Sequence, residues 1–125
     1  MEQTRRFFEK LGIGPFRLFE PEYDEKFYLG EKGDFKMKFA LASLGPIELE
    51  LIEPLAGKSV YRDFLKKTGG GFHHLAYDVP DLAEAIEMLR ALGMILTMSG
   101  ARKGVRFAYL QGESGPTLEL IERKG

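Results

Sequence analysis

The pentapeptide Leu-Glu-Leu-Ile-Glu occurs twice in this chain, at Leu49–Glu53 and at Leu118–Glu122. Each copy follows a Gly-Pro pair by a few residues: Gly45-Pro46 and Gly115-Pro116. In an extended strand the two copies place Glu50 and Glu119 at equivalent positions, on the face opposite their flanking leucines. A structural unit that is repeated twice is therefore the first expectation for the fold.

The similarity between the halves extends to a helix end followed by glycine, because Glu9–Ile13 resembles Arg90–Met94. These two segments are 81 positions apart, whereas the two pentapeptides are 69 positions apart. The first half of the chain therefore has 12 additional residues, which we place as an insertion within Pro21–Asp34. The strand expected at Phe72–Val79 has no counterpart, since its projection onto the first half falls before Met1. The expected fold is thus α+β, with paired βαβββ modules of which the first lacks its opening strand.

Local patterns predict the individual elements within one domain. Residues 1–55 form the first module, with a helix and three strands: Thr4–Leu11, Phe16–Glu20, Phe35–Leu44 and Ile47–Glu53. Residues 56–70 form a helical linker, capped by Ser59 and ended by the glycine run 69–71. Residues 71–125 form the second module: the strand Phe72–Val79, a helix opened by the capping box Asp81-x-x-Glu84 and ended by Gly93, and strands Ile95–Met98, Val105–Leu110 and Thr117–Glu122.

Bulk composition excludes several classes of protein. The 125 residues are 44% hydrophobic and 30% charged, as in ordinary globular domains, and the net charge is −1. This balance offers no electrostatic footprint for nucleic acid or an anionic membrane, and no apolar run is long enough to span a bilayer. The chain has no cysteine, so disulfides and thiolate chemistry are excluded. We expect a cytoplasmic protein.

Strand alternation groups three side chains that suit a metal. In the strand from Phe72, the side chains of His74, Ala76 and Asp78 share one face, and His73, Leu75, Tyr77 and Val79 share the apolar face expected to pack on the helix. If the two sheets curl towards each other, Glu50, His74 and Glu119 converge. One imidazole and two carboxylates suit a divalent first-row metal.

Each of these residues also has a simpler interpretation. A glutamate that alternates along a strand is most often only solvated, and a single histidine can be purely structural. His73 is expected to point away from the site. The basic tip Arg102-Lys103-Gly104 is expected to be an exposed hairpin turn, although it could also meet a phosphate. The glycine run before His73 lacks the Lys-Ser/Thr of a phosphate loop.

Three segments carry a family likeness: Gly71–Val79 followed by Asp81-Leu82, Ile52–Leu55, and Gly12–Phe16. With them the chain resembles the vicinal-oxygen-chelate superfamily over essentially its whole length. Within the superfamily it is nearest to the methylmalonyl-CoA epimerase and glyoxalase I group. By motif match it implies metal ligation by Glu50, His74 and Glu119, whereas the family's first-strand histidine has no counterpart here.

The resemblance implies proton transfer next to a carbonyl, assisted by a divalent metal such as Co, Ni, Mn or Zn. Glu119 is the first candidate for the catalytic base, with Glu50 and then Glu48 behind it. The implied substrate is an acyl-CoA in an epimerase, or a hemithioacetal in the glyoxalase I alternative. A third possibility is a metal-free module that binds antibiotics. An uncovered strand edge in the first module favours a homodimer.

Overall fold

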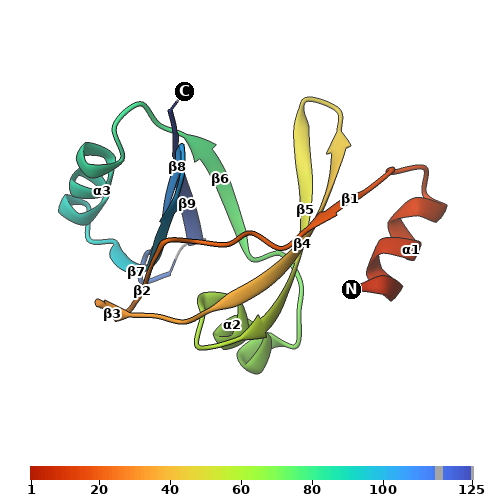
Figure 1. Ribbon diagram of the computed structural model, residues 1–125, viewed down its shortest axis with the longest axis horizontal. Helices are drawn as coiled ribbons and strands as arrows, with labels where there is room; N and C mark the ends of the chain where they lie inside the picture. The colour runs from red at the N-terminus through yellow and green to blue at the C-terminus, as the bar shows by residue number, and fades with distance from the viewer. Residues whose placement is uncertain (115–116, 125) are drawn as a thin grey trace.

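The computed structural model describes residues 1–114 and 117–124. The Gly115-Pro116 pair that precedes the second pentapeptide therefore lies outside the described residues, as does Gly125. The described elements run in the order α1 (Glu2–Lys10), β1 (Arg17–Phe19), β2 (Glu25–Tyr28), β3 (Glu31–Lys32), β4 (Lys36–Leu44), β5 (Ile47–Ala56), α2 (Val60–Thr68), β6 (His74–Asp78), α3 (Leu82–Ala91), β7 (Ile95–Arg102), β8 (Val105–Gln111) and β9 (Thr117–Arg123) (Figure 1).

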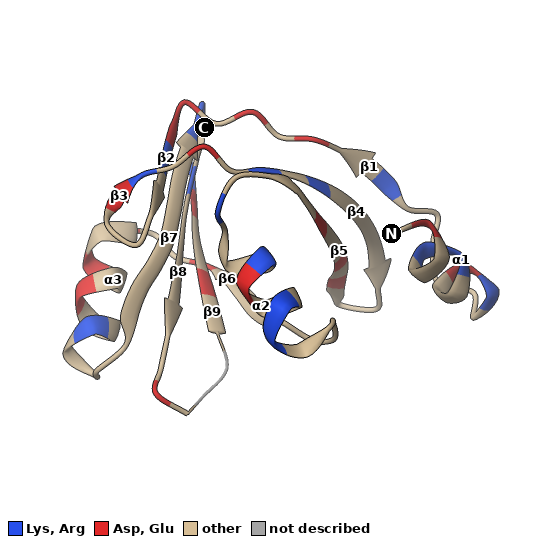
Figure 2. Cartoon of the chain, turned by 90° about the horizontal axis from the view of Figure 1, so that it is seen from below, with Lys and Arg blue, Asp and Glu red and all other residues tan. Residues whose placement is uncertain are grey.

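The strands form two separate sheets, and the fold is α+β as expected. The smaller sheet has the order β1-β4-β5, and the larger has the order β3-β2-β7-β8-β9-β6. All strand pairs are antiparallel except β6 with β9, which run parallel. The two copies of the pentapeptide lie in β5 and β9, the second strands of the equivalent hairpins β4–β5 and β8–β9. Figure 2 shows the two sheets side by side, with their strands curving around α2.

Two short strands join the halves of the chain in a way the sequence pattern does not indicate. The segment expected as an insertion contains β2 and β3, and β2 pairs with β7 of the larger sheet, with Phe27 opposite Ser99. The neighbouring Tyr28 donates a hydrogen bond from its hydroxyl to the Asp63 carboxylate of α2. The first half of the chain therefore contributes strands to the sheet of the second half.

Three apolar clusters define an inner and an outer face for each sheet. The inner cluster lies between the sheets and α2, and consists of Phe35, Met37, Phe39, Val60, Tyr61, Met98, Phe107 and Tyr109. On the outer faces, α1 packs over Leu49 and Leu51 of the smaller sheet, and α3 packs over Leu120 of the larger one. Ile52 and Ile121 pack against the inner cluster. The expected alternation of both pentapeptides is thus confirmed.

The helix caps expected from the sequence are also present. The Ser59 hydroxyl accepts a hydrogen bond from the Arg62 backbone N–H at 3.2 Å, and Gly69 ends α2 with a φ of 81°. The Asp81 carboxylate accepts from the backbone N–H of Glu84 at 3.1 Å, which starts α3. Along the described part of the chain, none of the helices has the length and apolar character needed to cross a membrane.

The strand β6 departs from the expectation that one apolar face packs on the helix. Leu75 and Tyr77 are 68% and 46% exposed, and only Val79, just beyond the strand, packs against the α3 cluster. The reason is position in the sheet, because β6 is the edge strand and α3 lies over β7, β8 and β9. Among the described residues β5 is an edge strand too, paired with β4 alone.

Candidate metal centre

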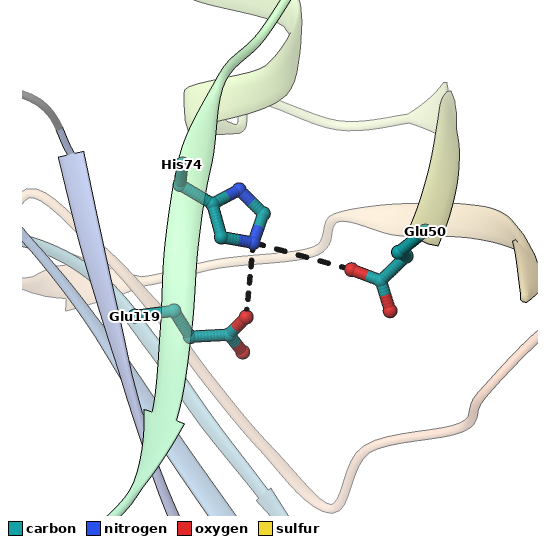
Figure 3. Close-up of side chains that lie close together, drawn as sticks. All are labelled: Glu50, His74 and Glu119. Carbon is teal, nitrogen blue, oxygen red and sulfur yellow. Dashed lines mark hydrogen bonds and ion pairs between the residues drawn. The ribbon is translucent and has the colours of Figure 1, made fainter. Parts of the chain in front are cut away.

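Three side chains from both sheets meet at one point between the inner faces. The Nε2 atom of His74 lies 3.1 Å from Oε1 of Glu119 and 4.0 Å from Oε1 of Glu50. One candidate ligand atom from each residue falls within 4.8 Å of the other two. Figure 3 shows one ring nitrogen of His74 facing the carboxylates of both Glu119 and Glu50. The structure therefore brings together the three residues that alternation and repetition had grouped.

Strand pairing positions these residues. In the parallel pair, Ala76 of β6 is opposite Glu119 of β9, so His74 and Glu119 are diagonal neighbours on the inner face. Glu50 reaches the site from the other sheet, where it pairs with Leu41 of β4. The side chains of His74 and Glu119 are only 8% and 11% exposed, and that of Glu50 is 29% exposed. The site is thus mostly shielded, with the Glu50 side the most open.

The geometry fits a divalent cation. Nitrogen and oxygen ligands lie ~2.1 Å from such an ion, which puts neighbouring donor atoms ~3.0–3.4 Å apart in octahedral or tetrahedral coordination. The 3.1 Å between Nε2 of His74 and Oε1 of Glu119 falls within this range. The 4.0 Å between Nε2 of His74 and Oε1 of Glu50 is longer, by a difference that a change of rotamer at Glu50 can close. An imidazole with two carboxylates is also a donor set that first-row divalent metals accept.

Charge repulsion within the site points in the same direction. Burial, together with the negative charges of Glu119 and Glu48, raises the pKa of Glu50 to about 8, although Arg123 acts in the opposite sense. Two carboxylates that share a partly dry site cannot both ionise without cost. A cation between them would remove this repulsion and favour the ionised form of both.

Aromatic rings form the wall behind His74. The ring of Tyr109 meets the imidazole edge to face, with centroids 4.9 Å apart. The Tyr109 hydroxyl shares a hydrogen bond of 2.5 Å with the hydroxyl of Tyr61, and burial raises the pKa of both phenols well above its usual value. These rings stay neutral and fix the orientation of the imidazole by packing.

His73 does not point away from the site, which corrects the expectation from alternation. Its Nδ1 atom lies 2.9 Å from Nδ1 of His74, and its ring packs on Phe64 and Tyr61 of α2. The physical reason is that β6 begins at His74, so His73 belongs to the connection before the strand and is not bound by its alternation. Burial and the neighbouring His74 lower the pKa of His73 to about 4.

Sequence reasoning also missed the two tyrosines. Tyr109 lies on the inner face of β8 directly opposite Glu119, and the alternation of Phe107 with Tyr109 in the expected strand Val105–Leu110 was a usable signal. Tyr61 offered none, because its contact depends on how α2 is placed between the sheets. By contrast, Glu48, the third candidate base, is exposed near the start of β5.

Two arginines lie on the inner face at one end of the larger sheet. Arg102 of β7 is opposite Val105 of β8, which in turn is opposite Arg123 of β9. Alternation places Arg102 on the face of Met98, and Arg123 on the face of Glu119. Of the hairpin tip expected at Arg102-Lys103-Gly104, the residues Lys103 and Gly104 form the turn between β7 and β8, whereas Arg102 is the last residue of β7.

The fold and this cluster identify the class of protein. The sequence profile of the Glyoxalase/Bleomycin resistance protein/Dioxygenase superfamily matches residues 1–110, and the chain belongs to this superfamily. It is 34% identical over 95 residues to the uncharacterized protein YqjC of Bacillus subtilis (strain 168), which covers 72% of this chain and 68% of YqjC. It is 30% identical over 82 residues to the mitochondrial methylmalonyl-CoA epimerase of Dictyostelium discoideum, and that match spans 61% of this chain and 49% of the epimerase.

Solved structures share the architecture. A hypothetical protein from Bacillus halodurans C-125 superposes with a TM-score of 0.67 at 24% identity, over 100% of this chain and 87% of the other. Methylmalonyl-CoA epimerase from Mycobacterium tuberculosis gives a TM-score of 0.67 at 23% identity, over 99% of this chain and 81% of the other. At these identities the likeness shows the fold.

Proposed function

We propose that this protein is a metal-dependent epimerase or isomerase that moves a proton next to a carbonyl group, as in methylmalonyl-CoA epimerase. The single observation that carries the proposal is the convergence of Glu50, His74 and Glu119, whose candidate ligand atoms lie within 4.8 Å of one another. The similarity to a methylmalonyl-CoA epimerase in sequence supports it.

The three side chains would hold a divalent cation such as Co, Ni, Mn or Zn. A cation bound there supplies Lewis acidity, which polarises the substrate carbonyl and lowers the cost of forming an enolate. Glu119 then acts as the base that removes the α-proton. Its side chain is only 11% exposed, so it would need little reorganisation to reach a proton held nearby.

Glu50 is the second proton carrier in this proposal. It approaches from the smaller sheet whereas Glu119 approaches from the larger one, so the two carboxylates meet the site from different strands and directions (Figure 3). Epimerisation removes a proton from one face of the α-carbon and returns one at the other face. Burial and the charges of Glu119 and Glu48 raise the pKa of Glu50 to about 8 in the metal-free site, and a bound cation would counter this shift. The role of Glu50 as proton carrier therefore rests on its position, on a different sheet from Glu119.

An anionic thioester is the substrate class we favour. Arg102 supplies positive charge on the inner face, whereas the neighbouring Arg123 is paired with Asp78. Arg123 marks the same end of the sheet and lies four positions along β9, about 13 Å of strand, from Glu119. The phosphates of an acyl-CoA carry the complementary charge at a distance from the thioester carbonyl. The alternative substrate is a hemithioacetal formed from a peptide thiol. Its carboxylates would match the position of this positive charge less closely than the phosphates of an acyl-CoA.

Solvent deuterium incorporation into methylmalonyl-CoA tests the proposal, with hemithioacetal isomerisation assayed beside it. The metal-loaded protein should exchange the α-proton, and Glu119→Gln should lower the rate roughly 10²–10⁴-fold, because the amide keeps the shape but cannot accept the proton. Glu87→Gln, on the exposed surface of α3, is the matched control and should keep the parent rate.

Absence of both activities in protein that has taken up its metal would overturn the enzyme proposal and favour the antibiotic-binding alternative. If the protein isomerises a hemithioacetal but does not exchange the α-proton of methylmalonyl-CoA, the proposed metal site stands and the substrate is a hemithioacetal. Equal activity of Glu119→Gln and the parent would exclude Glu119 as the base.

A further inference from the structure

The imidazole rings of His73 and His74 contact each other through the same ring nitrogen. Their Nδ1 atoms lie 2.9 Å apart, which is a hydrogen-bond distance. Two imidazole nitrogens at this separation need one proton between them, so that one ring donates and the other accepts. The protonation pattern of one histidine therefore determines that of the other.

The other nitrogen of His74 is the one that faces the carboxylates. Its Nε2 atom is 3.1 Å from Oε1 of Glu119 and 4.0 Å from Oε1 of Glu50. Figure 3 draws both contacts as dashed lines from the same ring nitrogen. A metal ligand uses a lone pair, so ligation at Nε2 leaves the ring proton on Nδ1. That N–H points at His73, because Nδ1 of His73 is its partner.

We propose that His73 is a positioning residue for the metal centre: its Nδ1 accepts the hydrogen bond from Nδ1–H of His74 and holds the Nε2 lone pair of His74 towards Glu50 and Glu119. This inference rests on the proposed metal site and adds a residue to it. Metal-ligating histidines commonly donate their second ring N–H to an acceptor, which fixes both tautomer and ring orientation. Here the acceptor is a second imidazole.

Packing explains how His73 can serve as a fixed acceptor. Its ring lies edge to face against Phe64, with centroids 4.9 Å apart, and against Tyr61 at 5.7 Å. It also lies 6.0 Å from the ring of Tyr109, which contacts His74 as well. These rings hold His73 from the side of α2 and β8.

The same contacts connect α2 to the site. Tyr61 and Phe64 of α2 pack on His73, and His73 contacts His74 in turn. The helix is fixed at its start by Ser59, which is 2% exposed and caps it. The placement of α2 therefore bears on the metal centre although the helix contributes none of the three candidate ligands.

The test compares the zinc affinity of the full parent chain with that of two variants, His73→Phe and His73→Asn. His73→Phe keeps a flat ring that can pack on Phe64 but removes the acceptor, and we expect zinc to bind roughly 10–100-fold more weakly. His73→Asn places an amide oxygen near the position of Nδ1 and should restore affinity towards that of the parent. Thermal unfolding without metal, measured in parallel, separates loss of the acceptor from loss of the fold.

The tautomers can be read in the parent, without any variant. Nitrogen-15 spectra of the zinc-loaded protein should show His74 ligated through Nε2 with its proton on Nδ1, and His73 protonated on Nε2 only. Ligation of His74 through Nδ1, or equal zinc affinity in the parent and His73→Phe, would overturn the role of His73. His74→Ala separates the two proposals. If His74→Ala binds zinc as tightly as the parent, the metal site itself is wrong. If His74→Ala loses zinc affinity but His73→Phe keeps it, only the positioning role of His73 is wrong.

Discussion

Glu50 and Glu119 hold the same position in the repeated pentapeptide, and the fold brings their candidate ligand oxygens to within 4.8 Å of each other from two different sheets. A duplicated strand has thus supplied both carboxylates of one site. Because two negative charges at this distance repel each other in a shielded place, the pair is unfavourable unless a proton or a cation lies between them.

Replacing His74 should remove most of the metal affinity. Structural zinc sites contribute about 10–16 kcal/mol through four ligands, so one ligand accounts for about 3 kcal/mol, or roughly 100-fold in affinity. Elemental analysis after reconstitution with zinc and washing should find metal in the parent and little in His74→Ala. Glu87→Gln should retain metal like the parent. Equal metal in His74→Ala and the parent would show that the ion binds elsewhere.

Glu50 should make the metal-free protein less stable as pH rises. Its pKa is raised to about 8 in the folded chain, so the folded state binds this proton more tightly than the unfolded state, in which the carboxyl has its ordinary pKa near 4.5. Between these two values the free energy of unfolding should fall with pH, by at most ~1.4 kcal/mol per unit. Urea unfolding with a chelator, repeated from pH 4.5 to pH 9, measures the slope.

The Glu50→Gln variant isolates this contribution, because an amide does not titrate. Its stability should depend less on pH than that of the parent over the same interval. Above about pH 8 the two slopes should coincide. Parallel curves for parent and variant throughout the range would mean that Glu50 keeps an ordinary pKa in the folded protein.

Arg102 should affect substrate binding more than turnover. If its charge meets an anionic group of the substrate far from the reacting carbon, Arg102→Ala should raise KM for methylmalonyl-CoA roughly 5-fold or more and leave kcat nearly unchanged. Lys103→Ala, at the exposed tip of the same hairpin, is the control for general loss of positive charge. A matching rise in KM for both variants would indicate only a diffuse field, which added salt would also weaken.

The open edge of β5 should support self-association. Among the described residues this strand pairs with β4 alone, and Ile47 at its start is 64% exposed. Unpaired strand edges are sites where another chain can add a strand, and a lysine there opposes such pairing. We expect a dimer in sedimentation experiments over a concentration series, and a shift towards monomer in Ile47→Lys.

Met88→Lys tests whether any added positive charge shifts the protein towards monomer, since Met88 is about as exposed as Ile47 but lies on α3, away from β5. It should sediment like the parent. A parent that stays monomeric at high concentration would exclude the dimer, and dissociation by Met88→Lys alone would place the interface on α3.

Local chemistry explains which elements the sequence predicted well. The caps at Ser59 and Asp81 depend on hydrogen bonds that span three residues, so they can be recognised from spacing alone. The strands β2 and β3 could not be predicted from local residue patterns in this way. They are two to four residues long with no sustained alternation, and β2 joins the larger sheet by pairing with β7, about 70 positions away.

The chain sequence by itself determined the repeat, the α+β class and the grouping of Glu50, His74 and Glu119, because period-two alternation and duplication are properties of the residue order. Only the tertiary structure decided that these residues meet, since Glu50 belongs to a different sheet from the other two. It also decided the raised pKa of Glu50 and the contact of His73 with His74. Burial, and the distance between groups on separate elements, arise from packing, which alternation along one strand does not encode.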